Sequence, residues 1–527
     1  MTYINTLSRR DFLSRTLRAG AALGLASLTQ VPPFARRALA ENSLGTNGKK
    51  LLFIFLRGAN DALNSLIPVG DSAYNNTIRP NIYIPPDSGT DYTASGPCDF
   101  PTGQSTTFAY ANAIRLGNGF AGLHPSLKFL APVYNAGDLA LIHRVGYPKQ
   151  SRSHFDSQAY WETGEPNSLV REGIFYRTLL ESGLTTSNPL SGVSIQAGLP
   201  TLLKGSQAAL TNLSDPTRYD LLGLPHVATT GDLKAMNALL AAQGSKFGSK
   251  RSRNLLDLQY ENMVSTLNLF STIDFTDAGN NFVDDVNSDG SGSSPYHLFP
   301  TSDAINGGGT AARYVVDTAA AAYSFFEQLK GAALILNNTD AIIAGTEMTG
   351  FDTHNNQGGV TGTHANLLSR IGWAFYALRK YFTLYHNRVD WNNVIVVTLT
   401  EFGRTTVQNN SNGTDHAEGG LMLVAGGAVK GYQKAGRQTG IFGCHPNDVI
   451  PWVPGPSGTM FAVGTRYLQR AVDYRSVLGE IIRDYLGASE GQLGRIIPGY
   501  GIAGEHLQNG PLSEIDNTPI MGELDLV

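Results

Sequence analysis

The sequence predicts an α/β protein with a mostly parallel central sheet, and three observations support this fold class. Residues 50–56 form an apolar run of strand length, which is typical of a parallel strand buried on both faces. Residues 125–134 have helical spacing with Pro125 in the first turn, and an apolar strand follows at residues 138–143. The alternation of helix and strand returns after residue 313, as expected for an α/β fold.

The second half of the chain supplies most of the expected elements. We expect helices over residues 313–336 and 364–385, strands over 340–347, 391–400 and 420–425, and a last helix from its N-cap Asp473 through Tyr485 to Gly487. The elements are spread over the chain without one clear linker, so residues 41–527 are expected to form a single domain. Two stretches rich in turn-forming residues, near 79–112 and 272–309, are expected to be surface insertions.

The second insertion contains one possible cation loop. Asp285, Asn287 and Asp289 alternate and Gly290 follows them, as oxygen ligands and glycine do in a calcium loop. However, Tyr296 stands where the loop needs a closing bidentate Glu. We therefore prefer to interpret these residues as a run of polar turns.

The first forty residues are expected to be an export signal. Arg9 and Arg10 precede the small-residue apolar stretch 19–28, and Ala38-Leu39-Ala40 offers a cleavage site. This pattern is typical of a twin-arginine signal. It predicts passage of the folded protein through the twin-arginine translocation machinery, to the periplasm or the surface of a bacterial cell.

Net charge, apolar runs and cysteines indicate which partners, membrane spans and disulfides to expect. Removing residues 1–40 takes away six Arg and one Asp, which changes the formal net charge from −4 to −9. Such an acidic chain is not expected to bind nucleic acid. No other apolar run approaches the roughly 20 residues of a membrane span, so no stable span is expected in the mature chain. Cys98 and Cys444 could pair after export or remain two buried thiols.

Side chains suited to metal binding follow the expected strands. Asp61 follows the strand at 50–56, Asp352 and His354 follow 340–347, Glu401 and Arg404 follow 391–400, and Asp415 and His416 lie in the next loop. Carboxyl ends of parallel strands meet at one edge of a sheet, where carboxylates and imidazoles can share a cation. Each of these residues alone is more often a turn residue. Together they predict a site for a divalent ion (Zn, Mn or Ca), with Arg404 either paired to Glu401 or holding an anionic substrate.

A nucleophile is expected where the strand at 138–143 leads into a helix. Ser151-Arg152-Ser153-His154 opens this helix, so a hydroxyl there would lie in the positive field of the helix N-terminus, where phosphate and sulfate bind. Ser153 is preferred over Ser151, and a simple N-cap serine is an equal alternative. Arg152 or Arg404 would then stabilise the anion.

Several common catalytic motifs are absent from the sequence. It contains no Gly-x-Ser-x-Gly, no His-Glu-x-x-His, no Walker loop and no Gly-x-Gly-x-x-Gly after the first strand. The usual serine hydrolase, zincin and dinucleotide-binding classes are therefore not indicated. A redox enzyme is also less well supported, because no haem, flavin or iron-sulfur signature is present.

The same polar segments carry a resemblance to a family. Residues 55–64 (FLRGANDALN), 151–155 (SRSHF), 350–354 (GFDTH), 400–405 (TEFGRT), 413–417 (GTDHA), 426–431 (GGAVKG) and 473–478 (DYRSVL) resemble the DUF1501 family of exported bacterial proteins. That family is similar in turn to the alkaline phosphatase and sulfatase superfamily. The resemblance implies an alkaline-phosphatase-like three-layer sandwich with metal ligands and a hydroxyl nucleophile, whose positions match Asp61, Ser153, Asp352, His354, Glu401 and His416.

The resemblance implies an exported metal-dependent hydrolase of phosphate or sulfate esters. The chain has Glu401-Phe402 where the superfamily often has Asp-His, so one imidazole is missing, and no diagnostic sulfatase cysteine motif surrounds Ser153. These departures support an alternative of another class, although the hydrolase remains the first expectation. In that alternative, the protein is a catalytically degenerate periplasmic or cell-surface binding protein on the same fold, with a polysaccharide or an exported protein as partner.

Overall fold

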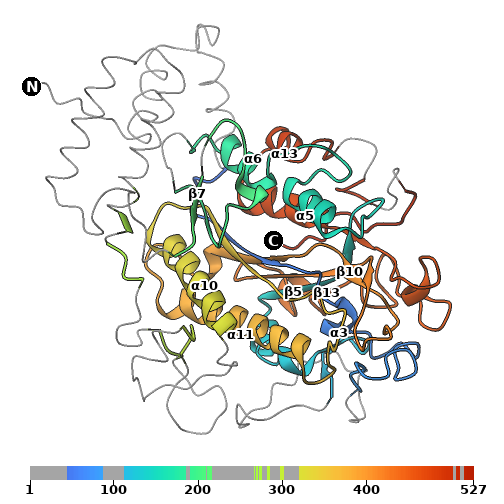
Figure 1. Cartoon of the computed structure of the whole chain (residues 1–527). Coiled ribbons are helices and arrows are strands. Elements are labelled where there is room, and N and C mark those ends of the chain that lie inside the picture. The colour runs from blue at the N-terminus through green and yellow to red at the C-terminus, as the bar shows by residue number, and fades with distance from the viewer. Residues whose placement is uncertain are drawn as a thin grey trace, which may run out of the picture. The chain divides into compact units, whose positions relative to one another are not determined.

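The computed structural model of the chain describes most residues after Ser43 (Figure 1). The described residues are 44–86, 112–185, 190–208, 210–215, 266, 269–270, 272–275, 282–284, 297–301, 320–501, 506–510 and 516–527. The expected export signal and its cleavage site lie outside these residues, as do Cys98 and the possible calcium loop at 285–296.

A mixed sheet forms the centre of the described fold (Figure 1). Its strands are β1 (Lys50–Leu56), β5 (Leu139–Gly146), β6 (Gly192–Ile195), β7 (Thr211–Leu213), β8 (Ile343–Met348), β9 (Val394–Leu399), β12 (Gly420–Gly426), β13 (Ile441–Phe442) and β14 (Val472–Asp473). The order is β13-β5-β12-β9-β1-β8-β6-β7, with β14 also paired to β5. Within this described sheet, only β12 runs antiparallel to its neighbours. The expected α/β class with a mostly parallel sheet is confirmed.

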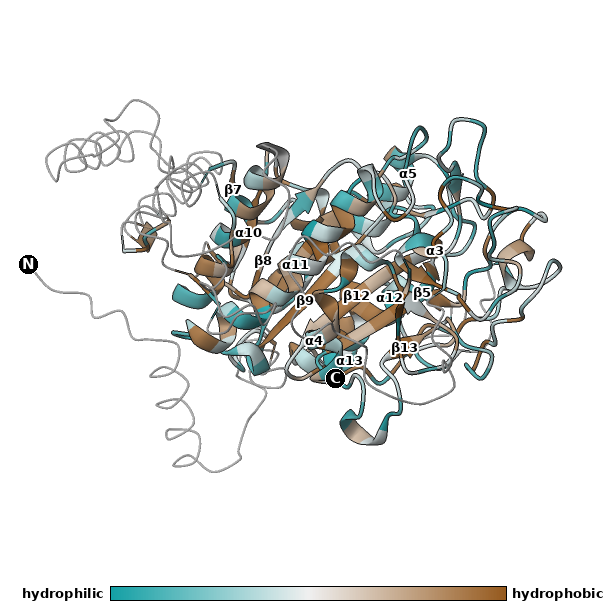
Figure 2. Cartoon of the chain, turned by 90° about the horizontal axis from the view of Figure 1, so that it is seen from below, coloured by the Kyte–Doolittle hydropathy of each residue, from teal (hydrophilic) through white to brown (hydrophobic). Residues whose placement is uncertain are grey.

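Helices cover both faces of the sheet, which explains why every residue of β1 is buried. Leu51, Phe53 and Phe55 pack in one core with the helices α6 (Ile174–Glu181), α12 (Tyr474–Glu480) and α13 (Glu490–Ile496). Alternate residues, such as Leu52 and Ile54, pack in a second core with α10 (Ala320–Asn338) and α11 (Thr363–Leu384). Successive strand residues point to opposite faces, so the apolar run at 50–56 serves both cores. Figure 1 shows α6 and α13 on one side of the sheet and α10 and α11 on the other, and Figure 2 shows that the strands are mostly hydrophobic.

Shorter elements connect the layers. They are α3 (Ala62–Ser65), β2 (Leu66–Ile67), β3 (Ile114–Arg115), β4 (Gly122–Leu123), η2 (Pro125–Leu127), α4 (Leu130–Asn135), α5 (His154–Thr163), η3 (Thr201–Leu203), η5 (Trp391–Asn393), β10 (Gly403–Arg404), β11 (His416–Ala417), η6 (Lys434–Gly436), η7 (Thr459–Phe461) and η8 (Ile481–Tyr485). Asp473 caps α12 as expected, because its side chain accepts a hydrogen bond from the backbone of Arg475. Gly487 follows the π-helical turn η8 with a φ of +87°, a conformation that suits glycine.

The two expected insertions differ from simple surface excursions where the structure describes them. Arg79, Ile82 and Ile84 are fully buried, because this segment packs beneath the loops that follow β9. Leu298 and Phe299, from the second stretch, belong to the core beside α11. Polar composition predicted exposure, but isolated apolar residues and one charged residue anchor these segments to the fold.

Two further expectations concern cysteine and the membrane. Cys444 is a buried free thiol. Among the helices of the described residues, none is both long and apolar enough to cross a membrane.

Candidate metal centre

The candidate residues follow strands that end at one edge of the sheet. The parallel register pairs Leu56 at the end of β1 with Met348 at the end of β8, and Phe55 with Leu399 at the end of β9. Because β12 is antiparallel, its first residue, Gly420, lies at this same edge, next to Val145 of β5. The segments after β1, β5, β8 and β9, and the segment before β12, therefore meet there.

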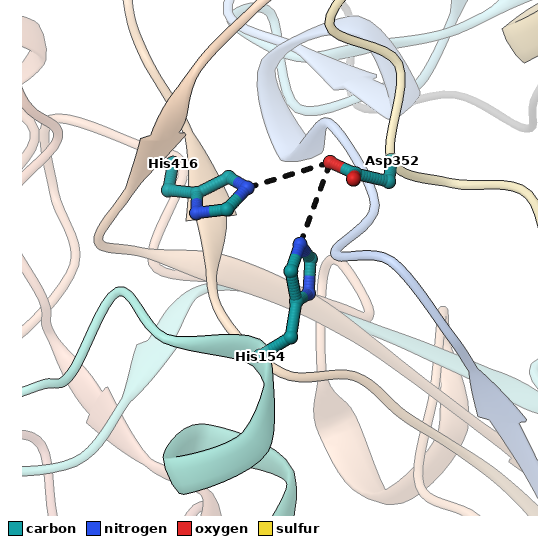
Figure 3. A group of neighbouring side chains, drawn as sticks. All are labelled: His154, Asp352 and His416. Atoms are coloured by element: carbon teal, nitrogen blue, oxygen red, sulfur yellow. Dashed lines mark hydrogen bonds and ion pairs between the residues drawn. The ribbon is translucent and has the colours of Figure 1, made fainter.

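Three side chains at this edge form a group that could hold a metal ion (Figure 3). His154 comes from the first residue of α5, Asp352 from the loop after β8, and His416 from β11. Asp352 Oδ1 lies 3.5 Å from His154 Nε2 and 3.4 Å from His416 Nε2. The ligand atoms of the three residues all lie within 4.8 Å of one another.

The outer nitrogen of each imidazole in the group has its own acceptor. His154 Nδ1 makes a short hydrogen bond to Glu401 Oε2, and His416 Nδ1 lies 2.7 Å from the carbonyl oxygen of Arg152. Placing the proton on each Nδ1 leaves each Nε2 with a free lone pair directed into the group. Within the described structure, His154 Nε2 is buried and makes no hydrogen bond. An imidazole oriented in this way by an outer acceptor is the usual arrangement of a metal-binding histidine.

His354 lies next to this group. Its Nε2 is 3.1 Å from Asp352 Oδ1 and 2.9 Å from His416 Nε2, while its Nδ1 is 3.1 Å from Asp415 Oδ1. With the proton of Nδ1 directed to Asp415, two nitrogen lone pairs face each other, which is unfavourable without a cation or a proton between them. Neighbouring ligands of a tetrahedral zinc ion lie about 3.3 Å apart, given zinc–nitrogen bonds of about 2.0–2.1 Å. The observed distances are therefore compatible with one ion shared by these side chains.

Glu401 lies behind His154 and does not belong to the group. Its Oε2 contacts His154 Nδ1, its Oε1 accepts a hydrogen bond of 3.2 Å from the backbone of Gly58, and its side chain is 3% exposed. The sequence predicted a metal ligand at this position. The geometry instead suits a carboxylate that orients a ligand.

Arg404 is buried and holds Asp352 in place. Its guanidinium lies 2.5 Å from Asp352 Oδ1 and also donates to the carbonyl oxygens of Gly58, Ala59, Phe351 and Thr414. Burial would raise the pKa of Asp352, but Arg404 outweighs this effect and holds that pKa below its ordinary value. Asp352 is therefore ionised at neutral pH. These contacts occupy the guanidinium of Arg404. Arg404 is therefore better suited to positioning Asp352 than to the expected contact with a substrate.

Asp61 lies apart from the group, in a buried ion pair. Both of its oxygens are bonded to Arg79, and Oδ2 also accepts from Gln357 at 2.7 Å. Burial would raise the pKa of Asp61, but the Arg79 guanidinium keeps it below its ordinary value. Arg79 also donates to the carbonyl oxygens of Thr405 and Thr406, so this pair supports the segment after β9.

The expected nucleophile caps a helix. Ser153 Oγ accepts a 3.4 Å hydrogen bond from the backbone of Asp156, as an N-cap of α5. Ser151 Oγ contacts the Asp156 carboxylate at 3.3 Å. The Arg152 guanidinium is ion-paired with Glu418 at 3.0 Å.

His154 is the residue of the group that sequence reasoning did not select. The signal was present, because this imidazole directly follows the N-cap of a helix that comes after a central strand. In an α/β sheet, that position lies at the carboxyl edge. The sequence pattern favours the preceding serine as a nucleophile and predicts no role for the histidine.

Comparison with known proteins gives a match to one part of the chain. A family model described as "Protein of unknown function (DUF1501)" matches residues 309–448. This match supports the DUF1501 family. It includes Asp352, His354, Glu401, Arg404 and His416, whereas His154 and Asp61 lie before it. No curated protein and no solved structure matches the chain. The similarity to the alkaline phosphatase and sulfatase superfamily stays a prediction.

Proposed function

We propose that this protein is an exported metal-dependent hydrolase of phosphate or sulfate esters, with His154, Asp352 and His416 as ligands of one divalent ion. The observation that carries the proposal is the convergence of two imidazole Nε2 atoms on one carboxylate oxygen, with each Nδ1 bonded to an outer acceptor. Three protein ligands are the usual number in catalytic zinc sites, which keep further positions open.

The donor atoms narrow the choice of ion. Two or three imidazole nitrogens with one carboxylate oxygen suit zinc or manganese, whereas calcium prefers a shell made of oxygen atoms. When bound, such an ion would supply Lewis acidity and lower the pKa of a bound water. The buried His154 Nε2 fits this use, because it makes no hydrogen bond in the described structure and lies 3.5 Å from the carboxylate oxygen of Asp352.

The protein's own groups would fix the geometry of the reaction. Arg404 holds Asp352, Glu401 holds His154, and the Arg152 carbonyl oxygen holds His416. Ser153 is occupied as a helix cap, which favours water over Ser153 as the attacking group in this proposal. His354 lies beside Asp352 and His416, where it would be either a further ligand or a contact to the reacting ester.

A binding protein without catalysis is the second candidate. Arg404 pairs with Asp352 at 2.5 Å and so compensates the charge of this carboxylate within the protein, which would allow the fold to persist after loss of a metal site. The two candidates differ in whether the purified protein contains metal.

The residues His154, Asp352 and His416, which we call the metal group, give the first prediction. We expect protein purified after metal-supplemented expression to contain about one transition-metal ion per chain by elemental analysis, and to hydrolyse an aryl phosphate or an aryl sulfate. Asp352→Ala and His416→Ala should lose both the metal and the hydrolysis, because each removes one of three ligands. Asp340→Asn, an exposed carboxylate near the start of β8, is the matched control and should keep both. Folded Asp352→Ala or His416→Ala protein that kept its metal and its activity would refute the assignment, whereas metal-free wild-type protein would favour the binding candidate.

A further inference from the structure

Two arginines and a tyrosine form a stack beside the metal group. The Arg152 guanidinium lies 3.9 Å from the centre of the Tyr467 ring, and that of Arg466 lies 5.7 Å from it. The side chains of Arg152 and Arg466 are 39% and 55% exposed. We call these three residues the arginine–tyrosine stack.

The stack is attached to the metal group on two sides. The backbone oxygen of Arg152 accepts from His416 Nδ1, and Arg466 lies 3.4 Å from Asp415, which contacts His354. The stack is therefore held next to the proposed ligands through short connections. In the described structure, the guanidinium that contacts Asp352 belongs to Arg404 and not to the stack.

The charges of the stack are available to a ligand. Arg152 pairs with Glu418 at 3.0 Å, and Arg466 pairs with Asp415 at a longer 3.4 Å. Exposed ion pairs of this kind contribute little free energy, so an incoming oxyanion can compete with them. Guanidinium groups bind phosphate and sulfate in a bidentate manner, and an aromatic ring beneath them restricts their orientation.

An exposed aromatic side chain directly follows His154 in the sequence. Phe155, the second residue of α5, is 88% exposed, which is unusual for a large apolar residue. Phe155 adjoins His154 in the sequence at the start of α5, and an exposed ring there offers a stacking surface for the apolar face of a sugar or for a nucleic acid base. Sites for single-stranded nucleic acid use several aromatic rings on which successive bases stack, whereas Phe155 is the only exposed Phe, Tyr or Trp side chain among the described residues, which favours a carbohydrate as the ligand.

We propose that the arginine–tyrosine stack binds a second oxyanion of the substrate, and that the substrate is a polyanionic carbohydrate bearing several sulfate or phosphate esters. One ester would lie at the metal group, and a neighbouring anionic group would contact Arg152 and Arg466. Phe155 would contact the sugar. The identity of the reacting ester rests on the proposed function, but binding at the stack does not require hydrolysis.

Affinity electrophoresis with full-length mature protein tests the proposal. Dextran sulfate in the gel is expected to retard the wild-type protein, and neutral dextran is not. Arg152→Gln and Arg466→Gln should each weaken the retardation by dextran sulfate about five- to tenfold in apparent dissociation constant, and added salt should weaken it further. Phe155→Ala should weaken it while leaving the charge unchanged.

Arg388→Gln is the matched control. Arg388 is also a half-exposed arginine in an ion pair, with Asp340 at 2.7 Å, but it lies before β9, at the opposite edge of the sheet. This variant changes the net charge by the same amount and is expected to bind as the wild type does. If it weakened binding as much as Arg466→Gln, the effect would come from net charge, and the proposed site would be refuted.

Two further outcomes separate the claims. If dextran sulfate binding depends on the stack but no ester is hydrolysed, the proposed function fails and the inference stands. If small aryl esters are hydrolysed but Arg152→Gln and Arg466→Gln bind dextran sulfate like the wild type, the inference fails and the proposed function stands. Retardation by single-stranded DNA equal to that by dextran sulfate, with the same dependence on Arg466, would overturn the choice of a carbohydrate.

Discussion

Asp352 shows how much of this site depends on one oxygen atom. Its Oδ1 lies within 3.5 Å of Arg404, His154, His354 and His416. A carboxylate oxygen has two lone pairs, so Arg404 can occupy one of them while the other remains directed toward the imidazoles. Arg404 thus sets the position of Asp352 and still leaves it able to bind a cation.

Glu401 gives a prediction about the orientation of a ligand. Glu401→Gln keeps the size of the side chain but replaces the carboxylate with a neutral amide. The carboxylate accepts one hydrogen bond from His154 Nδ1 and another from the backbone nitrogen of Gly58. We expect metal affinity to fall about 10–100-fold, as for other outer partners of metal-binding histidines, with little change in stability. A competition assay with a chelating dye measures the affinity. Loss of all bound metal, as for Asp352→Ala, would instead make Glu401 a direct ligand.

Gly58 gives a prediction about a close approach of two backbone segments. It has a φ of +104°, and an added Cβ would lie 2.4 Å from the backbone nitrogen of Asp352. Gly58→Ala should therefore cost at least about 1–3 kcal/mol in the free energy of unfolding, and it should displace Asp352 and weaken metal binding. Gly48→Ala is the control, because its φ is +77° but no atom lies within 4 Å of the added Cβ. Equal costs for the two variants, measured by urea unfolding, would show that the contact with Asp352 has no effect.

At the scale of the elements, the sequence predicted where ligands would meet but not how each would be used. The apolar strands at 50–56 and 394–399 were recognisable from composition, and parallel strands bring their exits to one edge. The partners of Asp61 were not predictable, because Arg79 lies 18 residues away in a segment whose composition resembles an exposed loop. Likewise, whether Glu401 faces the proposed ion or a histidine depends on a rotamer set by packing, which no periodicity in the sequence encodes.

The segment that carries Arg79 gives a prediction at this scale. Arg79 and Asp61 are both fully buried, and Arg79 also donates hydrogen bonds to backbone carbonyl oxygens of the segment after β9. Arg79→Met would leave Asp61 buried without its counter-charge, at a cost of about 3–5 kcal/mol in the free energy of unfolding. Arg388→Met, which breaks an exposed pair, should cost no more than about 1 kcal/mol. Similar unfolding midpoints for the two variants in urea would contradict a supporting role for the buried pair.

At the scale of the whole molecule, the site is assembled from distant parts of the chain. His154 and Glu401 are separated by 247 positions, and they come together only because β5 and β9 both flank β12. The family match begins at residue 309 and so covers Asp352 and His416 without His154. A complete metal group therefore needs the first half of the sheet as well as the matched region. The overall class was predictable from strand and helix patterns, whereas this convergence required the strand order.

Three buried histidines make the stability of the whole fold depend on pH. His124, His143 and His364 are fully buried, and burial lowers the pKa of His124 and His143 to about 3 and that of His364 to about 4. The unfolded chain binds a proton at each near pH 6.5, whereas the folded protein does not. Their contribution to stability is therefore complete above about pH 6.5 and is lost as the pH falls to about 4 for His364 and to about 3 for His124 and His143.

At pH 5, each of these histidines should reduce the free energy of unfolding by about 2 kcal/mol relative to neutral pH. Asp448 acts in the opposite direction, because burial raises its pKa to about 6. Burial also raises the pKa of three glutamates, Glu165, Glu418 and Glu480. The rises at these three glutamates are smaller, so the four carboxyls do not offset three imidazoles whose pKa values fall to about 4 or below. We therefore expect the urea midpoint to fall between pH 7 and pH 5. His124→Gln removes one of the three, so its free energy of unfolding should depend less steeply on pH, by about 1 kcal/mol per pH unit between pH 6 and 5. His386→Gln, at an exposed position, should leave the slope unchanged. An unchanged slope for His124→Gln would show that His124 takes up a proton in the folded protein.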